Sequence, residues 1–170
     1  MNSFSPTYYD AHWYGPFALD ELSILRDDKN LVIYMVSGTH GIYGRSVPLY
    51  IGMTEQGIEA RITQHLEWLN TESDPPKVYA AAISEMKCWQ EISNKDSYDP
   101  PDKRTIEDIE SLLIYSHQLA YNIKSKIGLN RHDRDFIVFN TGKRSALYPE
   151  VSTMNWYGDR RAPEEDNENQ

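Results

Sequence analysis

The sequence predicts an α+β domain with a small three-stranded antiparallel sheet flanked by helices. Its 170 residues are enough for one hydrophobic core and leave little room for a second. Apolar runs and helical spacings alternate in the order helix, strand, strand, helix, strand, helix, strand. About ten residues join the first two strands, too few for a parallel crossover, so these strands should form an antiparallel hairpin.

Residues 1–30 are predicted to form an N-terminal arm followed by a short helix. The first residues are rich in Tyr, Trp and Pro and have no clear period, which indicates an arm packed on the domain. A helix is predicted for residues 17–28, before Asn30. Its apolar side would consist of Leu19, Leu22, Ile24 and Leu25.

Residues 31–127 are predicted to form the central part of the domain. Short runs rich in β-branched residues predict strands over 31–36, 47–53 and 77–83. The first two strands are separated by a loop that begins at Ser37.

Two helices are expected within this central part. Thr54 is a predicted N-cap for a helix ending near Asn70. Its buried side would consist of Ile58, Ile62, Leu66 and Leu69. Thr105, with Asp108 three residues later, is predicted to open the longest helix, and Gly128 to end it. Its apolar stripe would run through Ile106, Ile109, Leu113, Leu119 or Ala120, and Ile123.

Residues 128–161 are predicted to be a basic extension packed on this central part. The extension should contain a strand over 136–139 and a turn at Asn140-Thr141-Gly142. The acidic, polar residues 162–170 are expected to be disordered.

Composition excludes several classes of protein. No run approaches the ~18–20 apolar residues of a membrane span. The single cysteine, Cys88, excludes an internal disulfide and a multi-cysteine zinc site. The first ten residues have neither a basic start nor an apolar segment, so a cytoplasmic location is expected.

The net charge of −9 disfavours a polyanionic partner, but the charge is unevenly distributed. Residues 122–161 carry eight basic and four acidic side chains, a local excess of four positive charges. Local fields steer ligands more than net charge does, so phosphate contact is expected here. The basic side chains are Lys124, Lys126, Arg131, Arg134, Lys143, Arg144, Arg160 and Arg161. A solvated basic face explains the same charges equally well.

Five side chains are of types that suit phosphodiester hydrolysis: Tyr34, Tyr50, Arg61, His65 and Glu110. A carboxylate can hold a divalent cation that keeps several waters, and a guanidinium stabilises charge on a phosphorane. An imidazole or a phenol can transfer the proton of water. Each also has an ordinary explanation, such as strand packing, a solvated helix face or a favourable helix-dipole position.

The order of these residues resembles the GIY-YIG nuclease superfamily. The first motif appears as Val32-Ile33-Tyr34, and the second as an intact Tyr50-Ile51-Gly52. The helix pattern of arginine and histidine is matched by Arg61 and His65, and the later glutamate and asparagine by Glu110 and Asn122. A literal Gly41-Ile42-Tyr43 also occurs, but it lies only seven residues before Tyr50. Tyr43 is therefore the weaker candidate for the motif tyrosine.

The resemblance implies a nuclease that cleaves DNA with one Mg²⁺ or Mn²⁺ ion bound by Glu110. Tyr34 would be the general base or would orient the attacking water, and Tyr50 would line the site. Arg61 would stabilise the transition state, His65 would assist Tyr34 or the phosphate, and Asn122 would be a structural brace. A free tyrosine titrates near pH 10, so Tyr34 would need help from the metal or a nearby cation.

The resemblance also bears on partners. Contact with nucleic acid is expected from the loop residues His40 and Arg45 and from the basic extension, through Arg131, Arg134, Lys143 and Arg144. A restriction-type endonuclease with a two-fold symmetric target would favour a homodimer. RNA is an alternative substrate. A protein that keeps the fold and binds nucleic acid or protein without cleavage is the alternative function.

Overall fold

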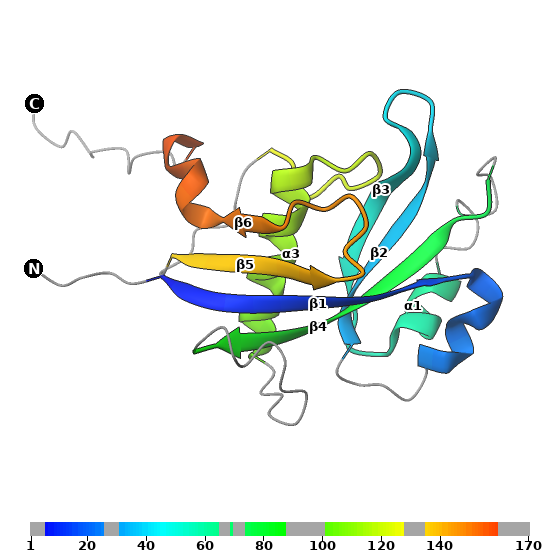
Figure 1. Cartoon of the computed structure of the whole chain (residues 1–170), viewed down its shortest axis with the longest axis horizontal. Helices are drawn as coiled ribbons and strands as arrows, with labels where there is room; N and C mark the ends of the chain where they lie inside the picture. Colours follow the sequence, from blue (N-terminus) through cyan, green and yellow to red (C-terminus); the bar gives the residue numbers. More distant parts are fainter. Residues whose placement is uncertain are drawn as a thin grey trace, which may run out of the picture.

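A computed structural model describes residues 6–25, 31–64, 69, 74–87, 101–127 and 135–159. Within these residues the chain forms one six-stranded sheet in the order β3-β2-β4-β1-β5-β6 (Figure 1). The strands are β1 (Thr7–Phe17), β2 (Leu31–His40), β3 (Gly44–Met53), β4 (Lys77–Met86), β5 (Phe136–Gly142) and β6 (Glu150–Ser152). The β1–β5 pair is parallel and the other neighbours are antiparallel, so the sheet is mixed.

Helices cover both faces of the sheet. The helix α3 (Lys103–His117) packs on one face, and α1 (Ile58–Thr63) and the 3₁₀ helix η1 (Leu19–Leu25) pack on the other. A second 3₁₀ helix, η3 (Thr153–Asp159), follows β6. None of the helices in these described parts is long and apolar enough to cross a membrane.

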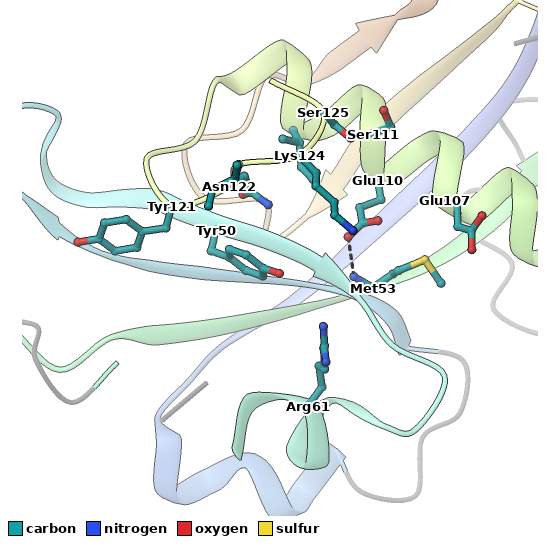
Figure 2. Close-up of a pocket in the computed structure, with 12 residues that line it drawn as sticks. Tyr50, Met53, Arg61, Glu107, Glu110, Ser111, Tyr121, Asn122, Lys124 and Ser125 are labelled. Atoms are coloured by element: carbon teal, nitrogen blue, oxygen red, sulfur yellow. Dashed lines mark hydrogen bonds between the residues drawn. The ribbon is translucent and has the colours of Figure 1, made fainter. Parts of the chain in front are cut away.

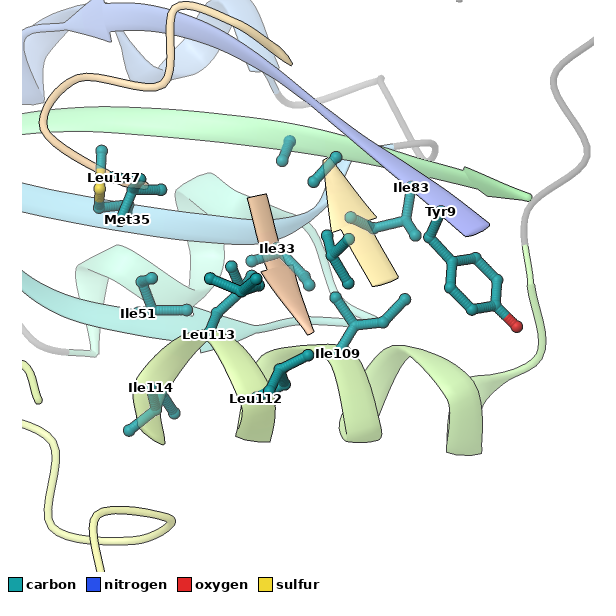
Figure 3. Packing of buried hydrophobic residues seen from close by; sticks show 14 of the residues in the cluster. Tyr9, Ile33, Met35, Ile51, Ile83, Ile109, Leu112, Leu113, Ile114 and Leu147 are labelled. Atoms are coloured by element: carbon teal, nitrogen blue, oxygen red, sulfur yellow. The ribbon is translucent and has the colours of Figure 1, made fainter. Parts of the chain in front are cut away.

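Alternation along β2 shows how the two faces are filled. Ile33 and Met35 belong to the cluster on the α3 side of the sheet, together with Ile109 and Leu113 (Figure 3). Tyr34 and Val36 belong to the cluster on the opposite face, with residues of α1 and η1. Because successive side chains of a strand point to opposite faces, a strand covered on both sides is apolar along its length. The same alternation places Tyr50 and Gly52 of β3 on the α1 side.

The predicted three-stranded sheet flanked by helices is therefore wrong. The three predicted strands form β2, β3 and β4, but they make up only half of a larger sheet. The segment expected to be an N-terminal arm is the strand β1, which lies between β4 and β5. The strand β6 was not predicted.

The polar residues of β1 explain why it did not look like a strand. Tyr9, Ala11 and Trp13 are buried in the cluster on the α3 side of the sheet, whereas Asp10 and His12 alternate with them. Polar groups in a buried strand need hydrogen-bond partners. The Thr141 hydroxyl donates to Asp10 Oδ1 (2.7 Å) and lies 2.8 Å from His12 Nδ1. The parallel neighbour β5 thus satisfies the side chains that interrupt the apolar pattern.

The helix boundaries also differ from the predictions. The segment 17–28 contains a 3₁₀ helix in which Leu22 and Leu25 are buried, but Ile24 is 70% exposed. Thr54 does not cap α1, because its hydroxyl donates to the Gly57 carbonyl and accepts from the Gln56 amide. The part of the predicted helix that includes Leu66 and Asn70 lies outside the described residues.

The long helix is shifted toward the N-terminus and is shorter than predicted. Asp102 is its N-cap, and its carboxylate accepts a bond from the Thr105 amide (2.8 Å). Gln118 ends the helix in the left-handed conformation (φ 49°), well before Gly128, which is outside the described residues. Ile123, expected in the apolar stripe, is 88% exposed.

His117, at the end of α3, fixes the loop before β6. Its Nε2 accepts a bond from the Tyr148 amide (2.8 Å), and its Nδ1 lies 2.7 Å from the Leu113 carbonyl. The imidazole also stacks on the Tyr148 ring, with centroids 4.8 Å apart. These two contacts require a neutral ring with the proton on Nδ1. Burial lowers the pKa of His117 from 6.5, which favours the neutral form.

Acid is therefore expected to weaken this loop contact. A histidine whose pKa is lowered by folding stabilises the folded state above the unfolded pKa of 6.5, and this contribution is lost as the pH falls. We expect the free energy of unfolding to fall as the pH decreases below 6.5. Urea titrations should show a smaller drop for His117→Gln. An equal drop in both proteins would contradict this role.

Candidate active site at the edge of the sheet

An open pocket of about 820 Å³ lies beside the edge strand β3. Side chains reach it from three directions (Figure 2). Glu110 and Glu107 come from α3, Arg61 comes from α1 on the other side of β3, and Tyr50 comes from β3 itself. The rest of its lining is Met53, Ser111, Ile114, Tyr121, Asn122, Ile123, Lys124 and Ser125.

The free edge of β3 is closed by side chains and by the segment after α3. The Asn122 carboxamide accepts from the Ile51 amide (3.0 Å) and donates to the Ile51 carbonyl (2.8 Å). The Tyr121 amide donates to the Leu49 carbonyl (2.9 Å). The Met53 amide donates to Glu110 Oε1 (2.9 Å). An exposed sheet edge invites pairing with other chains, and these contacts prevent it. They also give Asn122 the bracing role expected from the sequence.

Glu110 is held in an environment that makes its ionisation difficult. Burial raises its pKa from 4.5 to about 7, and the neighbouring Glu107 adds to this effect. The Met53 amide, Arg61 and Lys124 act in the opposite direction. A carboxyl group that is half protonated near neutral pH and faces an open pocket is typical of a functional site.

Arg61 is the cation on the opposite side of the pocket. It lies in the last turn of α1, and its Nη1 donates to Gln64 Oε1 (2.8 Å). Its charge lowers the pKa of both Glu110 and Tyr34, so it acts on both sides of β3. A guanidinium with several donors that lines an open pocket suits an anionic oxygen such as that of a phosphate.

The two motif tyrosines occupy different positions. Tyr50 lines the pocket, whereas Tyr34 is fully buried and is not part of the lining. Their rings lie 5.9 Å apart. Burial, with a further contribution from Tyr50, raises the pKa of Tyr34 despite the opposing charge of Arg61. The Tyr34 hydroxyl has no hydrogen-bond partner in the described residues. Tyr34 therefore stays protonated behind Tyr50.

Gly52 makes the close approach of the two rings possible. A Cβ atom at this position would lie 2.6 Å from the Tyr34 hydroxyl and 2.8 Å from Cε1 of Tyr50. No real Cβ contact is that short, so a side chain here would displace at least one ring. The glycine of the Tyr50-Ile51-Gly52 motif thus has a steric function.

Gly52→Ala is expected to lower the free energy of unfolding by about 2 kcal/mol or more, because the added methyl group overpacks a buried site. Chemical denaturation measures this change. Gly41→Ala is the matched control, since the Cβ position of Gly41 has no atom within 4 Å. Its stability should change by less than about 0.5 kcal/mol. Similar values for both variants would contradict the steric argument.

The other predicted site residues are not gathered at this pocket. His65, Arg131 and Arg134 lie outside the described residues. The Arg144 guanidinium donates a hydrogen bond to the Leu147 carbonyl of the same loop. Lys143 and Arg45 are exposed, and neither lines the pocket. Tyr43 lies in the turn between β2 and β3, is 55% exposed and does not line the pocket either.

Two charged residues of the pocket were not singled out from the sequence. Glu107 precedes Glu110 by three residues, and this spacing puts both carboxylates on one face of α3. Lys124 was named only as one of eight basic residues in its region. Lys124 follows Asn122 by two residues, and the Asn122 bonds to Ile51 place this segment beside the edge of β3. That spacing is the feature from which Lys124 could have been predicted.

The acidic side chains fit a hydrated magnesium ion better than a fully coordinated transition metal. The described residues contain no group of three or more His, Cys, Asp or Glu that could surround an ion. Mg²⁺ keeps several waters and is usually held by one or two carboxylates. Glu110, with Glu107 one helical turn away, supplies such a donor set.

Comparisons with family models, with curated proteins and with solved structures find no match to this chain.

Proposed function

We propose that the protein is a metal-dependent endonuclease of the GIY-YIG type that hydrolyses phosphodiester bonds in DNA. One observation carries this proposal: Tyr50, Arg61 and Glu110 reach the same open pocket from a strand and from helices on opposite faces of the sheet. These are three of the five side chains to which the resemblance assigns a role in the reaction. A restriction-type role with a two-fold symmetric target and a homodimer is the finer form of the proposal.

In this proposal, the cationic residues hold the phosphate. Arg61 donates to the non-bridging oxygens and stabilises the charge that develops on them in the transition state. Lys124, on the α3 side of the pocket, adds a second positive charge near Glu110. Both positive charges line the pocket, where they can stabilise negative charge on a bound phosphate.

Glu110, with Glu107 nearby, would hold Mg²⁺ or Mn²⁺. The bound ion would polarise a phosphate oxygen and make water a better nucleophile. Met53 fixes the Glu110 carboxylate through its Oε1, and this orients the other oxygen of the same group.

Tyr50 is the tyrosine that can contact the attacking water, because it lines the pocket. Tyr34 supports the Tyr50 ring from behind and stays protonated. We expect Tyr50→Phe to lower kcat at least tenfold more than Tyr34→Phe. Tyr34→Phe should change stability little, since the buried hydroxyl that it removes has no hydrogen-bond partner among the described residues. A larger loss of kcat in Tyr34→Phe than in Tyr50→Phe would indicate that Tyr34 is the general base.

Incubation of the full-length protein with supercoiled plasmid and either Mg²⁺ or Mn²⁺ tests the proposal. We expect nicked or linear DNA, no product with a chelator, and defined ends by sequencing. Binding of DNA without cleavage, over a range of metals and salt, would favour a module that binds and no longer cuts. Cleavage of RNA alone would change the substrate class.

A further inference from the structure

The turn between β2 and β3 carries an exposed isoleucine where turns usually have small or polar residues. The hairpin projects from the rest of the sheet (Figure 1), and Gly41, Ile42 and Tyr43 form its tip. Ile42 is 87% exposed and Tyr43 is 55% exposed. Ile42 therefore contributes almost nothing to the core, and its side chain is open to contact with a partner.

The tip is ordered by His40. The Nδ1 atom of His40 accepts bonds from the amides of Ile42 (3.2 Å) and Tyr43 (3.4 Å). The His40 ring stacks on Tyr43, with centroids 4.9 Å apart, and meets Tyr121 edge-on at 6.0 Å. Because Tyr121 lines the pocket beside β3, the same contacts connect the tip to the candidate active site.

The hairpin is also narrow and lacks negative charge of its own. No Asp or Glu occurs between Asp28 and Glu55, in a chain with 26 acidic residues. The Cβ positions of Gly41 and Gly44 have no atom within 4 Å, so the tip has little bulk beside Ile42 and Tyr43. Arg45 is exposed directly after the turn. Asp74 contacts the hairpin, where its carboxylate accepts a bond from Thr39 (2.6 Å).

We propose that Ile42 is a wedge that enters a groove of duplex DNA and partly unstacks a base step, while Arg45 contacts the phosphate backbone. Proteins that insert apolar side chains between base pairs kink the duplex and bring more of it against their surface. The major groove, about 12 Å wide, admits a two-stranded β-ribbon, so a hairpin tip can reach the base steps of a duplex. The inference rests on the proposed function, because it requires DNA to lie across the pocket next to the tip.

A second copy of the chain is the other occupant that an exposed apolar tip suggests. Stable protein interfaces bury about 800 Å² on each partner, far more than two side chains at one turn can supply. A tip without acidic residues and with an exposed arginine suits a polyanion better. Duplex DNA therefore fits this tip better than a second copy of the chain does.

Permanganate oxidation tests the wedge without knowledge of the target sequence, because it attacks thymines that are not stacked. The full-length Glu110→Gln protein would be bound to labelled random-sequence duplexes in the presence of Mg²⁺. We expect thymines within the bound region to become at least about fivefold more reactive. Adding Ile42→Ala should abolish this increase and leave binding detectable. Ile24→Ala, which truncates a 70% exposed isoleucine on η1, should retain it.

The outcomes separate the wedge from the endonuclease. Binding without reactive thymines, or equal reactivity with and without Ile42, would overturn the wedge. A change in self-association on Ile42→Ala, with no effect on bound DNA, would also overturn it in favour of a second copy. Plasmid cleavage by the wild type without unstacking would support the endonuclease and reject the wedge. Unstacking without cleavage supports the wedge alone, and absence of both binding and cleavage rejects both.

Discussion

Glu110→Gln should lower the rate of DNA cleavage by about three orders of magnitude while preserving the fold. Glutamine keeps an oxygen that can accept the bond from the Met53 amide, so the edge of β3 stays closed. The variant loses the negative charge that would hold the metal ion. Single-turnover kinetics with saturating metal should therefore show a loss in the chemical step, and circular dichroism should show an unchanged fold.

Two further variants test whether the effect of Glu110→Gln is specific to the pocket. Glu85→Gln, on an exposed part of β4, removes the same charge away from the pocket and should have no effect. Glu107→Gln removes a neighbour that raises the pKa of Glu110, so the cleavage profile should move to lower pH. Retention of full activity in Glu110→Gln would reject the proposed metal site.

Stability offers an independent measure of the same carboxyl group. Its pKa is about 7 in the folded protein and 4.5 when unperturbed, so the folded state binds the proton more tightly. This stabilisation is present below pH 4.5 and is lost as the pH rises through 7. For a partly exposed group we expect a loss of about 1–2 kcal/mol in metal-free protein. Added Mg²⁺ should restore the lost stability in the wild type and not in Glu110→Gln.

The part of the site that the sequence predicts best is the part that depends on local spacing. Tyr50-Ile51-Gly52 lies on a strand, Arg61 lies on the helix that follows, and Glu110 lies on the long helix. Alternation in a strand and the period of a helix determine where such side chains point. The meeting of Arg61 and Glu110 at one pocket, however, depends on helices packed on opposite faces of the sheet, which spacing cannot reveal.

The sequence was misleading where long-range contacts replace local ones. The strand β1 looks irregular because Asp10 and His12 are polar, and their partner Thr141 is 131 and 129 residues away. The order β4-β1-β5 pairs β1 with β5, which follows it by more than a hundred residues along the chain. No local pattern contains that pairing, and a segment without clear period was therefore read as an arm.

The end of the long helix was missed for a related reason. Apolar residues continue at helical spacing as far as Ile123, but Gln118 adopts the left-handed conformation that ends the helix. The chain then turns back so that Tyr121 and Asn122 can bond to the edge of β3. Those contacts stabilise the turn through the tertiary structure. They also bring Lys124 into the pocket, where a longer helix would have carried it away.

Arg61→Ala should lower kcat/KM by about a hundredfold to a thousandfold, with most of the loss in kcat. Arg61 is a partly exposed side chain on a short helix, and its described hydrogen bond goes to Gln64 on the same surface. Its removal should therefore change stability by less than about 0.5 kcal/mol.

Arg61→Lys should recover only part of the activity, because lysine keeps the charge but lacks the planar fork of donors. Arg104→Ala, which removes an exposed arginine outside the pocket, should cleave normally. If Arg61→Ala raised KM and left kcat unchanged, Arg61 would bind DNA equally in the ground and transition states, and its proposed role in stabilising the pentacovalent phosphate would be wrong.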